Sequence, residues 1–309
     1  MLLAVVFLIL GAAVLTAGAE GAIRGTTRFA TAVGVPAFVL GALLFGIDLE
    51  GLSAAVLAAG RGQTQIAAGE AFGTVVFLFG IGFALALLLS RGPIRSPSPL
   101  MVVAPAVSVA AAAISVYDQY VSRSEGLLLV LLYAGYVTVV VADGRSVGAR
   151  ARELEREASE LPSTVQAGVV ALVGLAAVYG GAWLLVDGGV RILSRTGLAA
   201  GFVGAAIIGT LASLDEVMLE VLPVRRNAPE LATGNLFGTV AAFSTAVIGL
   251  AALVRPLSID SVADLSFLAA AALYAVVAVV FLWRGQISKP TAVVLLGLYG
   301  AWLGYAVTR

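Results

Sequence analysis

Long apolar runs separated by short polar turns make up most of this chain. A transmembrane helix needs about 20 predominantly apolar residues. Ten runs approach or exceed that length, at approximately residues 2–19, 28–60, 63–90, 99–117, 125–142, 166–186, 196–224, 230–254, 265–283 and 290–307. The second and seventh runs are longer than one crossing requires, which allows a break within each of them.

One long charged segment, GRSVGARARELEREASELPSTVQ at residues 144–166, separates five apolar runs from the other five. Its alternating Arg and Glu residues are typical of a solvated helical linker. We therefore predict a first unit at residues 1–143, a linker at residues 144–165 and a second unit at residues 166–309.

The two units are internally repeated. At a constant offset of 163, Gly and Arg residues coincide at Gly11, Gly18, Gly25, Arg28, Gly34, Gly41 and Gly46 against Gly174, Gly181, Gly188, Arg191, Gly197, Gly204 and Gly209. The offset then becomes 165, and Leu49, Glu50, Gly69, Phe72, Gly73 and Thr74 fall on Leu214, Asp215, Gly234, Phe237, Gly238 and Thr239. A repeat of five spans enters the membrane from opposite sides, an arrangement that many secondary transporters share. The predicted fold is an all-α polytopic membrane protein with ten transmembrane helices in two inverted five-helix repeats.

The basic residues predict the orientation of the chain. Cytoplasmic loops carry an excess of Lys and Arg. One side of the predicted topology holds Arg24, Arg28, Arg91, Arg95, Arg145, Arg150, Arg152, Arg156, Arg225, Arg226, Arg284 and Lys289, whereas the other holds only Arg61, Arg123, Arg191, Arg195, Arg255 and Arg309. We expect a cytoplasmic linker, two extracellular termini and residence in the plasma (inner) membrane.

Composition narrows the chemistry. The chain is 61% hydrophobic and 12% charged, which a soluble domain could not accommodate. It contains no Cys and no His, so any ion must be bound by carboxylate, hydroxyl, amide or backbone oxygens, which suit Na⁺, Ca²⁺, Mg²⁺ and Mn²⁺. The formal net charge of zero argues against a nucleic-acid partner. The expected partners are the lipid bilayer and small inorganic cations.

Carboxylates inside the apolar runs are the candidate functional groups. Each costs roughly 2.5 to 3.5 kcal/mol near the bilayer centre and usually faces a cavity or a partner. After Gly209 the second repeat carries Thr210, Ser213, Asp215, Glu216, Glu220, Asn235, Thr239 and Ser244, and after Gly46 the first carries Asp48, Glu50 and Glu70. The spacing places Ser213, Glu216 and Glu220 on one helical face, with Asp215 pointing elsewhere. A buried ion pair is the structural alternative.

These stretches resemble a known family. LVDGGVRILSRTGLAAGFVGAAIIGT, SLDEV and ELATGNLFGT are similar to the second alpha-repeat of the sodium/calcium exchanger superfamily, whose usual motifs are GTSLPEL and DLAxGNxxGSN. GAEGAIRGTTRFATAVGVPAFVLG, GIDLEGL and IAAGEAFGT are similar to the first. The resemblance implies ten helices in two inverted repeats, with cations bound between the second, third, seventh and eighth helices and exchanged in alternation.

The resemblance also assigns residues. It implies that Glu216 is the ion-binding glutamate of the second repeat. By the same resemblance, Ser213 is the motif serine, Thr239 supplies the hydroxyl of GSN and Asn235 is the asparagine of GN. The first repeat departs from the motif, because the family glutamate falls on Gly51. In the first repeat, Asp48 stands at the position of the motif serine and Glu50 at that of the motif proline. In the second repeat, Asp215 stands at the position of the motif proline. Glu70 replaces the asparagine of GN. The family's last acidic or amide position falls on Leu78 and Phe243.

We therefore expect a secondary-active antiporter that exchanges Ca²⁺ or a related cation for Na⁺ or H⁺ by alternating access. The expected charged ligands are Asp48, Glu50, Glu70, Asp215 and Glu216, and the neutral ligands are Thr74, Ser213, Asn235 and Thr239. An alternative is a Na⁺/H⁺ exchanger that does not carry Ca²⁺. An enzyme is disfavoured because no HExxH motif or nucleophile with a base is present. No cofactor is expected beyond the transported ions.

Two further features predict helix contacts. Gly174, Gly181 and Gly188 are expected to permit close packing between helices in lipid. Arg28 and Arg191, at matched positions of the repeats, are expected to pair with Glu20 and Asp187 at helix ends.

Overall fold

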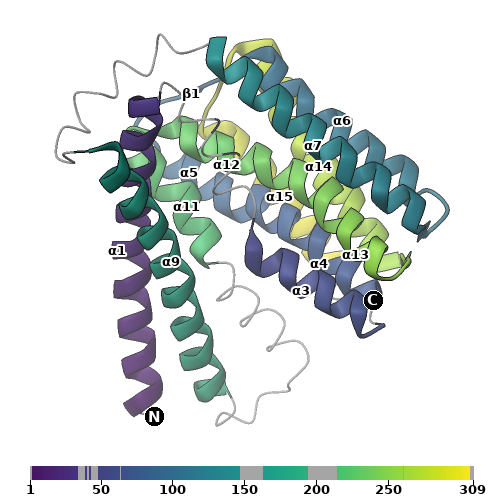
Figure 1. Cartoon of the computed structure of the whole chain (residues 1–309), viewed down its shortest axis with the longest axis horizontal. Coiled ribbons are helices and arrows are strands. Elements are labelled where there is room, and N and C mark those ends of the chain that lie inside the picture. The colour runs from purple at the N-terminus through teal and green to yellow at the C-terminus, as the bar shows by residue number, and fades with distance from the viewer. Residues whose placement is uncertain are drawn as a thin grey trace.

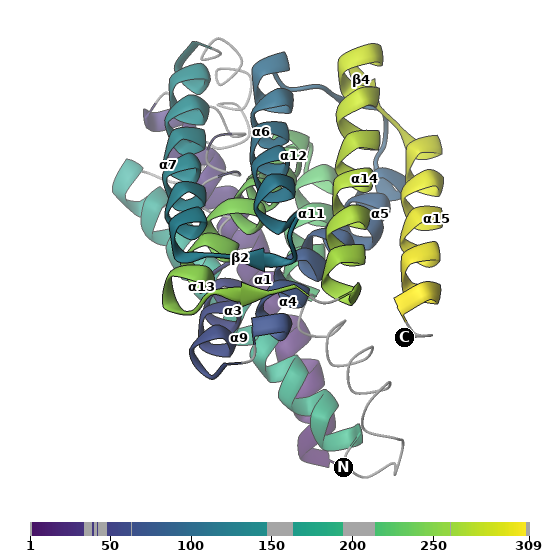
Figure 2. The same ribbon diagram turned by 90° about the vertical axis from the view of Figure 1, so that its right-hand side faces the viewer.

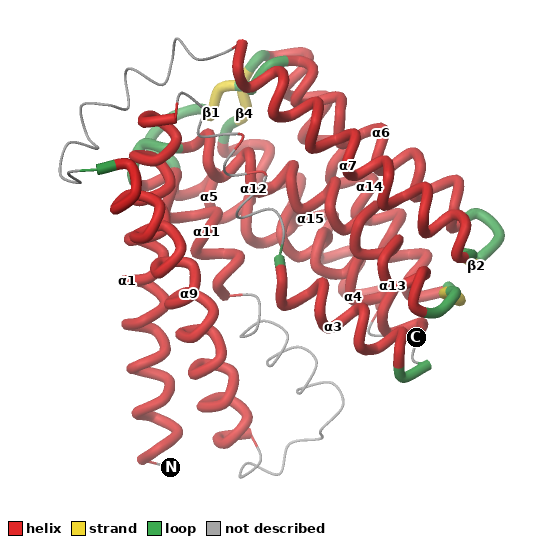
Figure 3. Tube along the Cα trace, in the orientation of Figure 1, coloured by secondary structure: helices red, strands yellow, loops and turns green. Residues whose placement is uncertain are grey.

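The computed structural model describes residues 2–33, 39, 42, 48–62, 64–146, 163–193, 214–259 and 261–306. The helices, in chain order, are α1 (Leu2–Val33), α3 (Leu49–Gly60), α4 (Thr64–Phe77), α5 (Ala84–Leu89), α6 (Pro99–Val116), α7 (Arg123–Ser146), α9 (Thr164–Leu193), α11 (Leu214–Arg225), α12 (Pro229–Ala241), α13 (Ile248–Val254), α14 (Ser261–Arg284) and α15 (Lys289–Ala306). Two π-helical turns, η2 (Leu78–Phe83) and η4 (Ala242–Val247), and the short strands β1 (Ile94–Arg95), β2 (Tyr120–Val121), β3 (Leu257–Ser258) and β4 (Gln286–Ile287) complete the described elements (Figure 3).

Several helices are long and apolar enough to cross a membrane. Among the described residues these spans are Val5–Ala30, Ala67–Leu89, Pro99–Val116, Arg123–Ala142, Thr164–Gly181, Pro229–Val254 and Asp264–Arg284. Two of them are continuous helices that run through a π-helical turn, α4–η2–α5 and α12–η4–α13. The protein is an all-α polytopic membrane protein, as the pattern of apolar runs predicts.

The shorter helices α3 and α11 occupy equivalent places in the two repeats. Each has 12 residues and forms the second part of an apolar run that was predicted to be broken. The predicted breaks at Gly46 and Gly209 lie outside the described residues. Both helices lead through a tight turn into a long central span, α3 into α4 and α11 into α12 (Figure 1).

The first and sixth spans are longer than predicted. Helix α1 continues to Val33 and α9 to Leu193, beyond the predicted ends at residues 19 and 186. The prediction that the second run begins at residue 28 was therefore wrong. Glycines in a transmembrane helix can serve close packing without ending the helix.

Helices α1 and α9 pack with their backbones in direct contact and lie side by side at the edge of the bundle (Figure 1). A Cβ atom added to Gly174 would lie 2.2 Å from the Ala22 nitrogen, and one added to Gly181 would lie 2.4 Å from the Leu15 nitrogen. The predicted packing role of Gly174 and Gly181 is therefore confirmed. The contacts of Gly188 lie outside the described side chains.

The register of this helix pair shows the inverted repeat directly. Gly18 lies opposite Val178 and Gly181 opposite Leu15, so both pairs sum to 196 (18 + 178 and 181 + 15) and the helices are antiparallel. Moving each residue by the repeat offset converts one pair into the other, since 18 + 163 is 181 and 178 − 163 is 15. Exchanging the two repeats therefore reproduces the same interface.

The strands join the two repeats in the same reciprocal way. β1 follows the third span and pairs antiparallel with β4, which precedes α15; β3 follows the eighth span and pairs antiparallel with β2, which precedes α7 (Figure 2). The helices also cross between repeats, because α14 packs on α4, α6 on α12, α13 on α3, and α5 on α11. The described helices thus form two inverted, interlocked repeats.

Candidate cation-binding site

Two carboxylates of α11 are buried on one side of the helix. Glu216 is 8% exposed and Glu220 is fully buried. Residues four apart lie on the same helical face, and on that face Glu220 contacts Asn235 of α12 and lies beside Gly82 of η2. The predicted shared face is confirmed for these two acids. Ser213, the third predicted member, lies outside the described residues.

Helix α12 supplies the opposing polar groups from the centre of the protein. Every residue from Leu231 to Thr245 is buried, so a polar side chain on this stretch faces other protein groups. Asn235 and Thr239 are each 2% exposed and lie one helical turn apart. Both were predicted as neutral cation ligands.

A hydrogen bond aligns the two helices. The Asn235 Nδ2 group donates to Oε1 of Glu220 at 2.9 Å. Extending the register of this hydrogen bond by one turn along each helix predicts that Glu216 lies opposite Thr239 (220 + 235 and 216 + 239 both equal 455). The interface therefore holds two successive polar levels, each with one carboxylate and one neutral side chain.

The same levels in the first repeat carry different residues. At the offset of 165, the first-repeat positions equivalent to Glu216 and Thr239 are Gly51 and Thr74. Those equivalent to Glu220 and Asn235 are Ala55 and Glu70. Gly51 has no side chain, and the ring of Phe243 lies over it: a Cβ atom added to Gly51 would be 2.8 Å from Phe243 Cζ. Where the second repeat has a glutamate, the first has a glycine covered by a buried aromatic ring.

Asp48 begins helix α3. Its Oδ2 atom accepts a hydrogen bond from the Gly51 backbone N–H at 3.0 Å, and its backbone oxygen accepts one from Leu52 at 3.0 Å. This is the geometry of an N-cap residue, which satisfies an otherwise unpaired amide of the first helical turn. Cation binding by Asp48 stays a prediction, and the capping role was not anticipated from the sequence.

Three predicted carboxylates are placed by their backbones only. Glu50 lies in the first turn of α3, Glu70 in α4 and Asp215 in the first turn of α11. Their side chains lie outside the described part of the structure, so their proposed ion contacts stay predictions. Among the side chains that are described, no three acidic residues are grouped closely enough to hold a metal ion.

The structure adds two features that the sequence analysis did not assign to the site. Glu220 lies on the same buried face of α11 as Glu216, and its spacing of four from Glu216 was the available signal. The π-helical turns η2 and η4 interrupt the third and eighth spans at nearly equivalent positions, and η2 packs against α11. Such turns are frequent at functional sites, but no residue type marks them in a sequence.

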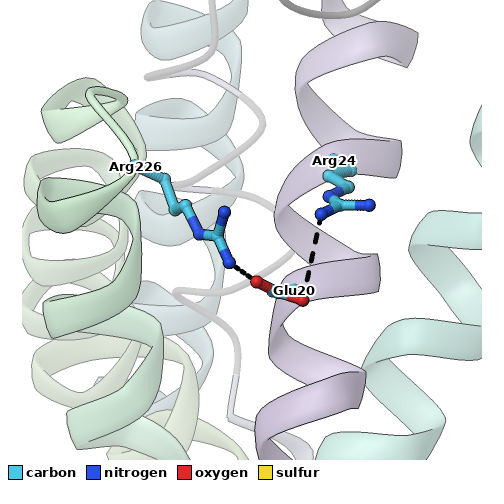
Figure 4. A network of polar contacts seen from close by, with 3 residues as sticks. All are labelled: Glu20, Arg24 and Arg226. Atoms are coloured by element: carbon cyan, nitrogen blue, oxygen red, sulfur yellow. Dashed lines mark ion pairs between the residues drawn. The ribbon is translucent and has the colours of Figure 1, made fainter. Parts of the chain in front are cut away.

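An ion-pair network joins α1 to the turn that follows α11. Glu20 pairs with Arg226 of that turn and, at 3.9 Å, with Arg24 one turn along α1 (Figure 4). The predicted Glu20–Arg28 pair was therefore wrong, because eight residues of helix separate these two by about 12 Å. Arg191 lies 5.3 Å from the centroid of the Phe7 ring. The Asp187 side chain lies outside the described residues.

Comparison with known proteins places this architecture in a family. The model of the family "Sodium/calcium exchanger protein" matches residues 3–142 and 167–308, which is most of the chain. The putative antiporter CaxA of Alkalimonas amylolytica is 27% identical over 274 residues, covering 85% of this chain and 84% of that protein. The inner membrane protein YrbG of Escherichia coli is 26% identical over 317 residues, covering 98% of this chain and 96% of YrbG.

A solved structure of the sodium-calcium exchanger NCX_Mj has the same fold, with a TM-score of 0.85 at 23% sequence identity and 98% coverage of both chains. At that identity the likeness concerns the fold. The family match rests on the sequence of both repeats and includes the segments that carry Glu216, Asn235 and Thr239. The chain belongs to the sodium/calcium exchanger protein family.

Proposed function

We propose that this protein is a secondary-active antiporter that exchanges Ca²⁺ or a related cation for Na⁺ or H⁺ by alternating access. The observation that carries the proposal is the buried polar interface of α11 and α12, where Glu220 accepts a hydrogen bond from Asn235 and where Glu216 and Thr239 are also buried. Buried carboxylates within spans mark ion pathways. Inverted repeats that meet around a midplane site suit alternating access.

The proposed ligands include both repeats. Glu216 is proposed as the central charged ligand because it is buried and, by the register of the Glu220–Asn235 hydrogen bond, is expected opposite Thr239. The remaining proposed ligands are Asp48, Glu50, Glu70, Asp215, Thr74, Ser213 and Asn235. A divalent ion such as Ca²⁺ prefers six to eight oxygen atoms, so two half-sites and backbone carbonyls near the helix breaks would have to contribute together. The family is one of transporters, and the site is proposed to bind and release ions without covalent chemistry.

A Na⁺/H⁺ exchanger without Ca²⁺ transport is the second candidate. The observation that favours it is Gly51 beneath the Phe243 ring. A glycine at the position equivalent to Glu216 leaves the first repeat without a carboxylate there. Fewer anionic oxygens favour a monovalent over a divalent ion. This candidate predicts Na⁺-driven proton movement that Ca²⁺ does not inhibit.

Transport by purified protein in sealed vesicles tests both candidates. We expect ⁴⁵Ca²⁺ uptake driven by an outward Na⁺ gradient or by a pH gradient. Glu216→Gln should lower that uptake at least about tenfold, because it removes a charge-assisted ligand worth about 1.5–3 kcal/mol. Glu230→Gln, which changes an exposed acid at the start of α12, is the matched control. The absence of cation flux under either gradient would refute the antiporter proposal.

The proposed location is the plasma (inner) membrane, with the linker in the cytoplasm and both termini outside. The excess of basic residues on the linker side supports this orientation.

A further inference from the structure

Glu220 and Asn235 form a buried pair with two unused oxygen atoms. Glu220 is fully buried and Asn235 is 2% exposed. The Asn235 amide nitrogen donates to one carboxylate oxygen. The other carboxylate oxygen, Oε2, and the amide oxygen, Oδ1, have no hydrogen-bond partner among the described residues. Each buried polar atom left unsatisfied in this way costs about 1–3 kcal/mol.

The described surroundings of Glu220 supply no compensating charge. The elements η2 and α5, which pack against α11, consist of LFGIGF and ALALLL and carry no titratable side chain. The titratable residues on α11 itself and on the other elements packed against it, α12, α1 and α9, are Asp215, Glu216, Arg225, Glu230, Glu20, Arg24, Arg28, Tyr179, Asp187 and Arg191. No ion pair joins Glu220 to any of these where the structure describes both side chains.

Two acceptor oxygens cannot satisfy each other while the carboxylate is ionised, since neither then carries a proton to donate. A metal cation between them would satisfy both. Carboxylate and amide oxygens are hard ligands that suit Na⁺. A single positive charge would also neutralise the single carboxylate, and a buried charge without a partner is strongly destabilising.

We infer that Oε2 of Glu220 and Oδ1 of Asn235 are ligands of a monovalent metal cation, Na⁺, bound between α11 and α12. Glu216 and Thr239, one turn away on the same two helices, lie at the adjoining polar level. Gly82 of η2 lies beside the aliphatic part of Glu220, because a Cβ atom at this glycine would be in ordinary van der Waals contact, 3.6 Å, with Cγ of Glu220. The aliphatic part of Glu220 is thereby packed, which holds its carboxylate towards α12.

This inference deepens the proposed function, on which it rests for its meaning in transport: Na⁺ would be the driving ion, and Glu220 would bind it at a level distinct from Glu216. Binding can nevertheless be measured without transport. If the protein transports cations in vesicles but its Na⁺ binding does not depend on Glu220, only this inference is overturned. Glu220-dependent Na⁺ binding without any flux would overturn only the antiporter.

The test compares thermal unfolding of the full-length purified protein in NaCl and in choline chloride, at equal pH and ionic strength. A ligand that binds only the folded state raises its stability, and near-saturating Na⁺ should raise the wild-type Tm by about 5 °C. Glu220→Gln should lose most of this shift, because glutamine keeps the size and the Asn235 hydrogen bond but removes the charge. Glu230→Gln should keep the shift.

Two outcomes would overturn the inference. One is an unchanged Na⁺ response in Glu220→Gln. The other is a wild-type protein that is stabilised by lower pH and not by Na⁺, since the occupant would then be a proton. Asn235→Ala is the second variant and should raise the half-saturating Na⁺ concentration at least about tenfold. Should neither variant fold, ²²Na⁺ binding to the wild type decides, because an absence of saturable binding refutes the site.

Discussion

Equivalent positions in the two repeats carry side chains of opposite character. Glu216 and Glu220 on α11 correspond to Gly51 and Ala55 on α3, whereas Asn235 on α12 corresponds to Glu70 on α4. The backbone is therefore symmetric while the candidate ligands are not.

Gly51 should be sensitive to the addition of one methyl group. In Gly51→Ala the new Cβ atom would lie 2.6 Å from Asp48 Oδ2 and 2.8 Å from Phe243 Cζ. Phe243 is fully buried and cannot move aside freely, so we expect a loss of about 1–3 kcal/mol of stability from overpacking. Thermal unfolding of the purified protein measures this loss of stability. Gly69→Ala in α4 is the matched control, because no atom lies within 4 Å of its added Cβ.

Combining Gly51→Ala with Phe243→Leu should recover part of the loss, since the smaller side chain makes room for the methyl group. A Gly51→Ala protein as stable as the wild type would show that the ring does not fill this space.

The sequence identified some site residues but not their contacts. Spacing alone placed Glu216 and Glu220 on one face, because helical periodicity is local. The Glu220–Asn235 hydrogen bond spans the turn between two helices, and its register depends on where that turn begins. The contact between Gly51 and Phe243 joins different repeats, so only the assembled fold reveals it.

At the scale of elements, the repeat was predictable and the helix ends were not. Coincident glycines revealed the offset of 163, yet the apolar pattern predicted that the first helix ends near residue 19. In the structure α1 continues to Val33, because Gly18 and Gly25 lie against α9. A glycine in an apolar run signals either a break or a close helix contact, and the partner helix decides which.

The α1–α9 interface should fail when its glycine contacts are filled. Gly174→Val would place side-chain atoms where the Ala22 backbone lies, since even a Cβ atom would be 2.2 Å from its nitrogen. The helices would have to separate, and we expect little monodisperse protein and a Tm lowered by several degrees. Gly180→Val, on the same helix, is the control, because no atom lies within 4 Å of its added Cβ. Equal yield and equal Tm for the two variants would contradict the close packing seen here.

At the scale of the whole molecule, α1 of the first repeat is attached to α11, α12 and the turn between them by a polar link and an apolar patch. Glu20 reaches Arg226 (Figure 4), and Ala22 and Ile23 pack with Leu219, Ala228 and Leu231. The ionic partners are partly exposed, so the pair contributes at most about 1 kcal/mol. The apolar contacts therefore provide most of this attachment.

The two strand pairs mark opposite ends of the fold and allow its orientation to be tested. Arg95 and Gln286 face each other in β1–β4, near Arg91, Arg284 and Lys289. The β2–β3 pair lies at the other end, near Arg123 and Arg255. Positive charge favours the cytoplasm, so the β1–β4 end is expected inside the cell.

Single cysteines in this naturally cysteine-free chain can report that orientation. Ser258 in β3 and Gln286 in β4 are both exposed strand residues. A membrane-impermeant maleimide applied to intact spheroplasts should label Ser258→Cys and leave Gln286→Cys unlabelled, because only the β2–β3 end faces outward. Both variants should react once the membrane is permeabilised, which controls for accessibility. The reverse pattern would place both termini and the β2–β3 end in the cytoplasm. The orientation predicted from the distribution of basic residues would then be wrong.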